Sequence, residues 1–488
     1  MIRALLLILL PALPLFGQAP TPAPPRWRGF NLLEMFRKEE AKPFREDDFR
    51  TIAEWGFNFA RLPMDYRIWI QDGDWRTIDP GSLRNVDAAL EYGKKYGVHV
   101  SLNFHRGPGY CVNPPKEAKD LWTDADAREV FALHWGAFAK RYKGIPSERL
   151  SFDLLNEPAG VEAAAYVAAM TPAIEAIRRE DPERRILAEG LKWGNAPVPE
   201  LLPLKVDFST RGYAPMGISH YAASWIPDSA KMPFPTWPVR QGVGDHLYGV
   251  GQPELHAPLV FKDFFAADTP FSIRVNTVSQ KTRLLVLAGD KVVLDKPFEP
   301  GPGEGEWKKA VFVEQYKVWQ NVYDRDYTAT IPAGTTEVRL VAIEGDWLTF
   351  SRLKLGSLEI VPGDLEWGRK PGTFTIGPDG RLDLSTSPIL YDHATHQKEQ
   401  IAPWKVLEAK GAAVHVGEWG VLNRTPHPVA LAWMEDCLRN WKDAGWGWAL
   451  WELRGGFGVL DSNRSDVTYE EFRGHKLDRK MLDLLRAY

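Results

Sequence analysis

The sequence is poor in cysteine and has no surplus of basic residues. Among 488 residues it holds two cysteines, Cys111 and Cys437. A disulfide-stabilised scaffold is therefore excluded, and no Cys/His spacing typical of a zinc site occurs. Lysine and arginine together number 60 against 64 acidic residues, which gives a formal net charge of −4. Because binding to nucleic acid depends on neutralising phosphates with basic side chains, this balance argues against a nucleic-acid partner.

Long apolar runs are missing after the first residues of the chain. Residues 4–16 form an apolar run that follows Arg3. This run is shorter than the roughly 20 residues that span a bilayer, and its composition is typical of a signal peptide. Pro11 and Pro14 would break a buried helix at this place. We therefore expect residues 1–18 to be a signal peptide, and the mature chain to be a secreted monomer, extracellular or periplasmic, without a membrane span.

The mature chain alternates short β-rich runs with amphipathic helical stretches, a pattern typical of a parallel α/β fold. Eight strands are expected, at residues 27–32, 57–62, 98–104, 150–155, 186–189, 217–220, 413–417 and 447–451. Helices are expected at residues 46–55, 83–96, 125–142, 161–180, 396–410, 428–444 and 476–487. This order predicts a (β/α)8 TIM barrel that is built from residues 26–224 and 396–488.

Residues 225–395 interrupt this pattern, because the helical period disappears and short β-branched runs alternate with Gly, Pro and Asp turns. Such punctuation predicts an inserted β-sandwich, located after the sixth barrel strand at the face where barrel active sites lie. The phrase EGDWLTFSRLKL near its end resembles jelly-roll carbohydrate-binding modules. A carbohydrate-binding role is therefore open for the insert, with Trp307, Trp319 and Trp347 as candidates for a glycan-binding face. Core packing is the alternative for each of them.

Polar residues at the carboxyl ends of the expected strands are the candidates for an active site. Two of them, Glu157 and Glu418, follow the apolar runs LSFDLL and AAVHV. Burying a carboxylate there costs free energy unless the group is paired or used. Two facing carboxyls are what glycoside hydrolysis requires, since one donates a proton to the leaving oxygen and the other attacks or activates water. For either glutamate alone, a salt-bridged structural role is an equal alternative.

Several segments together resemble glycoside hydrolase family 5, the cellulase-like barrels with two catalytic glutamates. They are RGFN, FNFARLPMDY, GVHVSLNFH, SFDLLNEP, ISHY, HVGEWG and WGWALWELRG. The resemblance covers both barrel segments but not the insert. It implies that Glu157 is the acid/base and Glu418 the nucleophile of a retaining double displacement. The other implied roles are Asn156 as the hydrogen-bond donor to the sugar 2-hydroxyl, Arg61 as the residue that steadies the nucleophile, His105 and His220 as polar groups around the cleaved bond, and Trp451 as the floor of the subsite for the reacting sugar.

One position departs from the family pattern. Many members place a tyrosine two residues after the sixth-strand histidine, where this chain has Ala222. The tyrosine that should contact the nucleophile is then either Tyr221, brought in by a local bulge, or another tyrosine of the chain. For Glu157, burial and a charged neighbour should raise the pKa, so that the acid keeps its proton.

These observations predict a retaining glycoside hydrolase that acts on a β-linked polysaccharide or oligosaccharide, most simply an endo-β-1,4-glucanase. β-Mannanase, xyloglucanase and exo-β-glucosidase activities remain open, as does a glycan-binding protein without turnover. No cofactor or metal is expected, because the HExxH and GxSxG signatures are absent and the strand-end histidines lack further ligands. Four of the 20 tryptophans lie in expected loops and are candidates for sugar platforms, namely Trp122, Trp193, Trp225 and Trp237. For any one of them, core packing is the favoured alternative, because aromatic side chains dominate cores.

Overall fold

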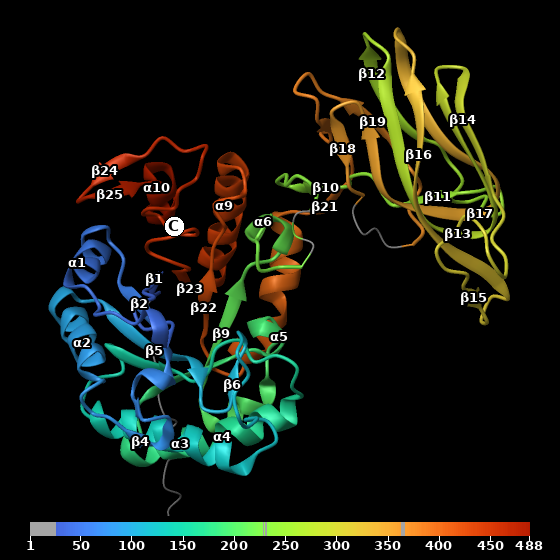
Figure 1. Cartoon of the computed structure of the whole chain (residues 1–488). Helices are drawn as coiled ribbons and strands as arrows, with labels where there is room; N and C mark the ends of the chain where they lie inside the picture. Colours follow the sequence, from blue (N-terminus) through green and yellow to red (C-terminus); the bar gives the residue numbers. More distant parts are fainter. Residues whose placement is uncertain (1–25, 228, 230–231, 363–366) are drawn as a thin grey trace, which may run out of the picture.

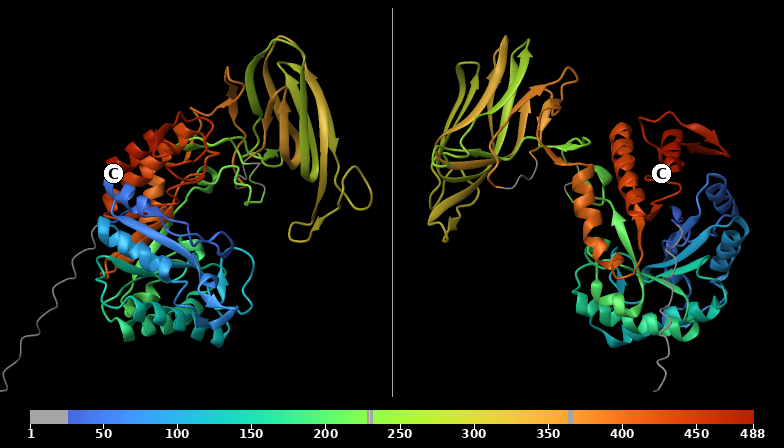
Figure 2. Two further views of the ribbon diagram at one scale, coloured as in Figure 1. Left: turned by 60° about the vertical axis from the view of Figure 1, so that its left-hand side comes forward. Right: turned by 180° about the vertical axis from the view of Figure 1, so that it is seen from behind.

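The computed structural model describes residues 26–227, 229, 232–362 and 367–488. The expected signal peptide at residues 1–18 lies outside the described residues. The chain forms a barrel and a β-rich domain, which are connected by the short strands β10 (Val239–Arg240) and β21 (Ile389–Tyr391) (Figure 1). The further views in Figure 2 show these two parts as separate lobes.

The first lobe is a closed barrel of parallel strands. Its strand order is β2-β1-β23-β22-β9-β8-β7-β5, and pairing of β2 with β5 closes the ring. The strands are β1 (Arg28–Asn31), β2 (Phe59–Asp65), β5 (His99–Gly107), β7 (Leu150–Asp153), β8 (Arg185–Glu189), β9 (Asp207–Gly212), β22 (Val414–Trp419) and β23 (Gly447–Leu450). The (β/α)8 barrel expected from the sequence is thus confirmed.

Helices surround this ring and pack their apolar faces on it. They are α1 (Glu46–Glu54), α2 (Arg84–Tyr96), α3 (Ala125–Arg141), α4 (Ala163–Glu180), α5 (Leu191–Gly194), α6 (Met216–Ser219), α7 (His393–His396), α8 (Lys405–Glu408), α9 (His427–Ala444) and α10 (Arg479–Ala487). The loops hold two short hairpins, β3 (Ile70–Gln71) with β4 (Asp74–Ile78) and β24 (Glu470–Phe472) with β25 (His475–Leu477). They also hold β6 (Tyr110–Cys111), which pairs with β5.

Local chemistry explains the bounds of several elements. The side chain of Asp124 accepts hydrogen bonds from the first backbone N–H groups of α3, which is the usual role of an N-cap aspartate. Helix α2 ends at Tyr96 and is capped by Gly97, whose φ of 70° favours glycine. The expected single helix at residues 396–410 was wrong, because the segment is divided into α7, a π-helical turn, a 3-10 turn and α8. Pro403 lies inside this segment and cannot supply an i→i−4 hydrogen bond.

The sixth strand was also placed wrongly by the sequence. Residues 217–220 belong to α6 and its C-terminal cap, whereas the strand is β9, ten residues earlier in the chain. Pro215 directly precedes α6, where proline is compatible with a helix start. Strand β9 escaped notice because it buries the polar Ser209 and Arg211 along with Phe208, so that no apolar run marks it. The β-rich insert nevertheless still follows the sixth strand.

The second lobe is built from strands with a hydrophobic core of its own. Its long strands are β13 (Thr269–Ala288) and β17 (Thr335–Leu355). Each joins two of the short β-branched runs of the sequence, residues 271–277 and 283–287 in β13 and residues 337–343 and 348–355 in β17. The remaining strands are β11 (His246–Tyr248), β12 (Leu259–Phe265), β14 (Lys291–Phe298), β15 (Phe312–Val313), β16 (Val318–Ile331), β18 (Leu358–Ile360), β19 (Thr373–Ile376) and β20 (Leu382–Asp383). Register shifts along the β13–β17 pairing mark bulges, which let one strand bend and continue.

Two further features concern the whole chain. Cys111 and Cys437 are both free thiols. Among the residues that the structure describes, none of the helices is long and apolar enough to cross a membrane.

Candidate active site

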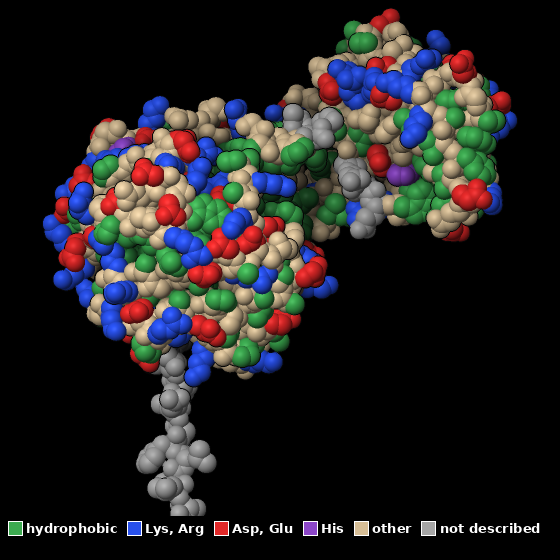
Figure 3. Space-filling view, turned by 60° about the horizontal axis from the view of Figure 1, so that its bottom comes forward, with side chains coloured by type: hydrophobic (Ala, Val, Ile, Leu, Met, Phe, Trp, Pro, Cys, Tyr) green, Lys and Arg blue, Asp and Glu red, His purple; other side chains and the backbone are tan. Residues whose placement is uncertain are grey.

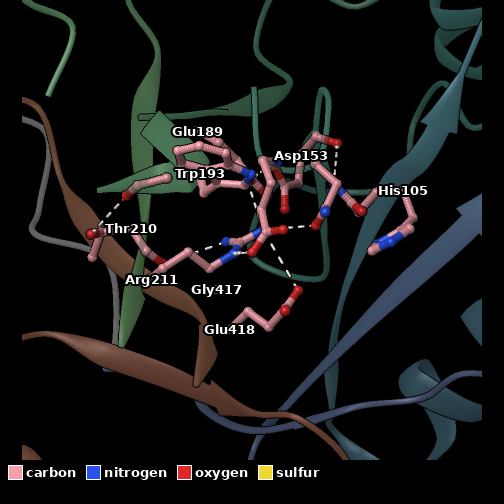
Figure 4. A network of polar contacts seen from close by, with 12 residues as sticks. His105, Asp153, Glu189, Trp193, Thr210, Arg211, Gly417 and Glu418 are labelled. Carbon is pink, nitrogen blue, oxygen red and sulfur yellow. Dashed lines mark hydrogen bonds and ion pairs between the residues drawn. The ribbon is translucent and has the colours of Figure 1, made fainter. Parts of the chain in front are cut away.

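Two glutamates contact one guanidinium at the carboxyl end of the barrel, Glu157 from the loop after β7 and Glu418 from β22. Figure 4 shows Arg211 and Glu418 within this network of polar contacts. Arg211, near the end of β9, donates from Nε to Oε1 of Glu157 at 3.1 Å. Its Nη2 lies 3.6 Å from Oε2 of Glu418, which belongs to β22. Gly417 allows this close approach, because a Cβ there would lie 2.2 Å from Oγ of Ser209 on β9. The two carboxyls predicted as a catalytic pair therefore lie together.

Arg61 of β2 organises the base of the same cluster. Its side chain is 1% exposed, and all five of its N–H groups can donate. The acceptors are Asp153 Oδ2 at 2.8 Å, Asn31 Oδ1 at 3.0 Å, Glu418 Oε2 at 3.2 Å, Asn156 Oδ1 at 3.0 Å and Glu189 Oε1 at 2.8 Å. A fully used guanidinium has little freedom to rotate, so Arg61 fixes the position of the Glu418 carboxylate.

The backbone of Glu157 is held in an unusual conformation. Its φ of 48° lies in the left-handed region, which is costly for a residue with a Cβ. The backbone N–H of Glu157 donates to Oε2 of Glu189 at 2.6 Å, and its carbonyl oxygen accepts from the Tyr110 hydroxyl at 2.7 Å. These two hydrogen bonds clamp the residue from both sides, and they direct its side chain to Arg211.

The charges of the cluster are unequal when all its groups are ionised. Four buried or half-buried carboxyls, those of Asp153, Glu157, Glu189 and Glu418, face the guanidiniums of Arg61 and Arg211. Burial, and next the negative charge of Glu418, raise the pKa of Glu157 to about 8. Burial, and next Glu189, raise the pKa of Asp153 to about 7. With protons on these two groups, two carboxylates match two guanidiniums.

Tyr213 occupies the position that the sequence left undecided. Its hydroxyl donates to Oε1 of Glu418 at 2.9 Å, on the oxygen that Arg61 does not contact. Burial, and next the charge of Glu418, raise the pKa of Tyr213 well above its usual value, so the hydroxyl keeps its proton. Tyr221 lies elsewhere, with its ring 6.2 Å from that of Phe234.

The other predicted residues lie around the cluster. The rings of His105 and Trp451 are stacked with centroids 5.9 Å apart. His220 follows α6 and has its ring 4.8 Å from that of Tyr213. Burial lowers the pKa of His220 to about 4 and that of His105 well below its usual value, so both rings are neutral at neutral pH.

Two buried donors of the cluster have no partner among the described residues. One is Nδ2 of Asn156, whose Oδ1 is fully used by Arg61 and Arg211. The other is Nδ1 of His105, whose Nε2 accepts from Asn113 at 3.2 Å, which places the ring proton on Nδ1. Buried donors of this kind are usually satisfied, so both groups are free to donate to a bound molecule.

Sequence reasoning missed four residues of this site, namely Asp153, Glu189, Arg211 and Tyr213. Asp153 and Glu189 are charged residues inside or at the end of otherwise apolar strands, which was a usable signal. Arg211 and Tyr213 were missed because the sixth strand was placed too late in the chain. In the described ranges, no three His, Cys, Asp or Glu side chains are arranged to hold a metal ion.

We predict that Tyr213→Phe lowers kcat on a cleavable β-glycan by about 10- to 100-fold, since a hydrogen bond to a charged group contributes about 1.5–3 kcal/mol. Tyr221→Phe is the matched control and should stay within about twofold of the wild type, because the Tyr221 ring lies by Phe234 and Tyr213 is the tyrosine that bonds Glu418. Steady-state kinetics of both variants on one substrate measure the difference. A larger loss in Tyr221→Phe than in Tyr213→Phe would contradict this assignment.

Comparison with known sequences shows which proteins the barrel resembles. Residues 19–218 match the sequence model of "Cellulase (glycosyl hydrolase family 5)". The chain is 30% identical over 196 residues to cellodextrinase A of Ruminococcus flavefaciens. The aligned region covers 38% of this chain and 55% of that protein. It is 31% identical over 198 residues to endoglucanase C of Acetivibrio thermocellus, which covers 39% of this chain and 57% of the relative. The chain thus spans little more than half the length of these relatives.

Solved structures agree with this placement. A crystal structure described as a glycoside hydrolase is 27% identical, with a TM-score of 0.61 and coverage of 95% of this chain and 99% of that chain. The endoglucanase Cel5A of Thermotoga maritima is 17% identical, with a TM-score of 0.51 and coverage of 94% and 96%, and so supports the fold alone. The resemblance to glycosyl hydrolase family 5 that the sequence motifs indicated is thus confirmed, since residues 19–218 match the model of that family.

Proposed function

We propose that the protein is a retaining glycoside hydrolase that cleaves β-linked glucan internally, as an endo-β-1,4-glucanase. The observation that carries this proposal is the pair of glutamates, Glu157 and Glu418, on the single guanidinium of Arg211. Retaining enzymes need two carboxyls that face each other at about 5–5.5 Å, too close for an intervening water. The glucan specificity is supported by the relatives named as endoglucanase and cellodextrinase.

In the first step of this mechanism, the Glu418 carboxylate attacks the anomeric carbon and the glycosidic C–O bond breaks. Glu157 gives its proton to the leaving oxygen, so that the departing chain leaves as an alcohol. Arg61 and Tyr213 orient the attacking carboxylate through the hydrogen bonds described above. The unpartnered Nδ2 of Asn156 is the donor for the sugar 2-hydroxyl. The product of this step is a glycosyl ester on Glu418.

In the second step, the ionised Glu157 takes a proton from a water molecule, and the resulting hydroxide attacks the same anomeric carbon. The ester bond to Glu418 breaks, and the carboxylate and the protonated Glu157 are restored. Because two inversions occur at one carbon, the product keeps the β configuration. Neutral His105, with a free Nδ1 proton, donates to a sugar hydroxyl beside Trp451.

Exposed aromatic side chains support an extended cleft for a polymeric substrate. Trp193 is 54% exposed, and its backbone N–H donates to the carbonyl oxygen of Pro158, directly after Glu157. Trp225 is 60% exposed and lies 6.1 Å from the ring of His220. A sugar ring presents a flat face of C–H groups, on which an exposed indole can stack. Trp122 and Trp237 are packed against protein groups instead, and we assign them no sugar.

The deciding experiment measures reducing-end release from β-glucan, glucomannan, xyloglucan, xylan and mannan, with Glu418→Gln as the control. We expect activity on β-glucan that the variant lacks. Activity on mannan or xyloglucan alone would show that the assigned substrate is wrong and would leave the two-glutamate mechanism intact. Release of glucose as the first product would indicate an exo-β-glucosidase. Binding of a glycan without turnover would contradict the proposed enzymatic activity and indicate a glycan-binding protein.

We further propose that residues 1–18 direct export and are removed, which leaves a secreted monomer acting outside the cytoplasm. The apolar run behind Arg3 supports this proposal. Expression of the full chain in a bacterial host should give a shortened protein in the periplasm or medium. N-terminal sequencing of that protein and its mass in light scattering check both parts. An intact Met1 on cytoplasmic protein would contradict export.

A further inference from the structure

An aromatic cluster lies in the β-rich domain, outside the barrel. His246 and Tyr248 of β11 stack with centroids 5.5 Å apart, and β11 pairs with the part of β17 that holds Trp347. Trp367 contacts all three rings, with centroid distances of 5.4 Å to His246, 5.1 Å to Tyr248 and 5.8 Å to Trp347. The backbone N–H of Gly368 donates to the Tyr248 hydroxyl at 3.1 Å. This bond holds the Trp367 segment on the cluster.

Trp367 is well exposed in spite of these contacts. Its side chain is 52% exposed, whereas Tyr248 beneath it is 1% exposed. The indole thus contacts the buried Tyr248 and the half-buried rings of His246 and Trp347 on one side and is open to solvent on the other. The space-filling view shows further apolar side chains on the surface of this lobe, mixed with charged ones (Figure 3). A lone apolar residue on a surface needs no explanation, but a supported ring beside a pocket does.

A shallow pocket with enclosed room for about one water molecule adjoins the cluster. His246 and Tyr248 line it, together with the polar side chains of Gln241, Asp245, Arg369 and Lys370. Nη1 of Arg369 is buried and has no hydrogen-bond partner among the described residues. Asp245 is held by Nδ1 of His246 at 2.6 Å. The pocket therefore offers both donors and acceptors next to an aromatic face.

This combination fits one class of ligand. A pyranose has an apolar C–H face for an indole and hydroxyl groups that both donate and accept hydrogen bonds. Asp245, Arg369 and Lys370 line the same pocket, so its rim offers both acceptors and donors to the hydroxyl groups of a neutral polyhydroxylated ligand. Ligand sites in general combine aromatic walls with a few polar groups that fix orientation.

We propose that Trp367, with Arg369 and the pocket beside them, is a second glycan-binding site that holds pyranose units of the polymer cleaved by the barrel. The choice of β-glucan as the ligand rests on the proposed function. The sequence pointed to Trp307, Trp319 and Trp347 for such a face. Of these three, Trp347 belongs to this cluster, whereas Trp307 packs against the core of the lobe and Trp319 against Phe312. A second site on one chain raises the affinity for a polymer more than for a short oligosaccharide.

The test compares binding to amorphous cellulose with hydrolysis of soluble cellotetraose, using the full chain. Trp367→Ala should weaken binding to amorphous cellulose about tenfold or more at 4 °C, since the polymer can then engage only the barrel. The kcat/KM on cellotetraose should stay within about twofold. Trp367→Phe keeps an aromatic face and should retain most of the binding. Phe264→Ala is the matched control, because Phe264 is 66% exposed on β12 of the same lobe and outside the cluster.

Several outcomes would overturn this inference. They are wild-type binding in Trp367→Ala, equal loss in Phe264→Ala, absence of binding in the wild type, and a parallel loss of cellotetraose hydrolysis. A lowered melting temperature of Trp367→Ala with no recovery in Trp367→Phe would also overturn it. If the wild type hydrolyses no glucan but binding still depends on Trp367, the site stands and the proposed function fails.

Discussion

Replacing Glu418 with glutamine is expected to lower kcat on a β-glucan by on the order of 10⁴-fold or more, since loss of a nucleophile removes the whole covalent pathway. The amide keeps the shape of the side chain, and its oxygen can accept from Arg61 while its NH2 group donates to the Tyr213 hydroxyl. Reducing-end release under saturating substrate measures the loss. A thermal melting curve of the variant verifies that the fold is intact.

A smaller side chain distinguishes the nucleophile from a carboxylate that only supports it. Glu418→Gly opens space beside the anomeric carbon, and added azide should restore cleavage of an activated aryl β-cellobioside. Azide that enters from the side of the lost nucleophile gives the α-glycosyl azide. In the matched variant Glu157→Gly, azide attacks the glycosyl ester from the opposite side and gives the β-glycosyl azide. The same anomer from both variants, or activity of Glu418→Gln within tenfold of the wild type, would rule out the assigned roles.

The sequence predicted the barrel and the acid pair for a physical reason that applies to all buried parallel sheets. Strands covered on both faces are continuous apolar runs, and LSFDLL and AAVHV are of this kind. A carboxylate one residue beyond such a run requires compensation, which singled out Glu157 and Glu418. Resemblance to the family then supplied the roles, including that of Arg61, which the apolar pattern alone does not give.

The support of the site could not be predicted in the same way. Arg211 is buried in β9, and its compensation comes from Glu189 on β8 and from Glu157 after β7, which are distant in sequence. A buried charge of this kind interrupts the apolar pattern of its own strand, and its partners become visible only in three dimensions. The strand was therefore placed at residues 217–220, and with it Tyr213 was lost as a candidate.

In the β-rich domain, the sequence predicted the presence of strands but not their lengths. Its short runs were correctly interpreted as strands, but bulges in β13 and β17 let pairs of runs continue as one strand. A turn and a bulge have similar local composition, so sequence punctuation does not separate them. Trp367 was missed because no expected strand lies next to it in the sequence. The rings that contact it belong to β11 and β17, which are distant along the chain.

Glu157→Gln is expected to remove the alkaline limb of the pH profile. Because the pKa of Glu157 is raised to about 8, the wild type should keep a protonated acid through neutral pH and lose kcat/KM above about pH 8. The glutamine variant has no proton to lose, so its remaining activity on cellotetraose, lower by on the order of 10²–10⁴-fold, should be flat across this range. With a dinitrophenyl leaving group, which departs without protonation, the first step should be far less affected.

The same raised pKa has a consequence for stability that is independent of catalysis. A glutamate in the unfolded chain has a pKa of about 4.3, so the folded state binds more protons between that value and about pH 8. The stabilisation that the protonated carboxyl provides is complete below the lower value and is lost as the pH rises through the upper one. Glutamine does not ionise, so the melting temperature of Glu157→Gln, relative to the wild type, should rise from pH 5 to pH 8. A constant difference across this range would show that Glu157 is ionised throughout, which would remove the physical basis for its role as the acid.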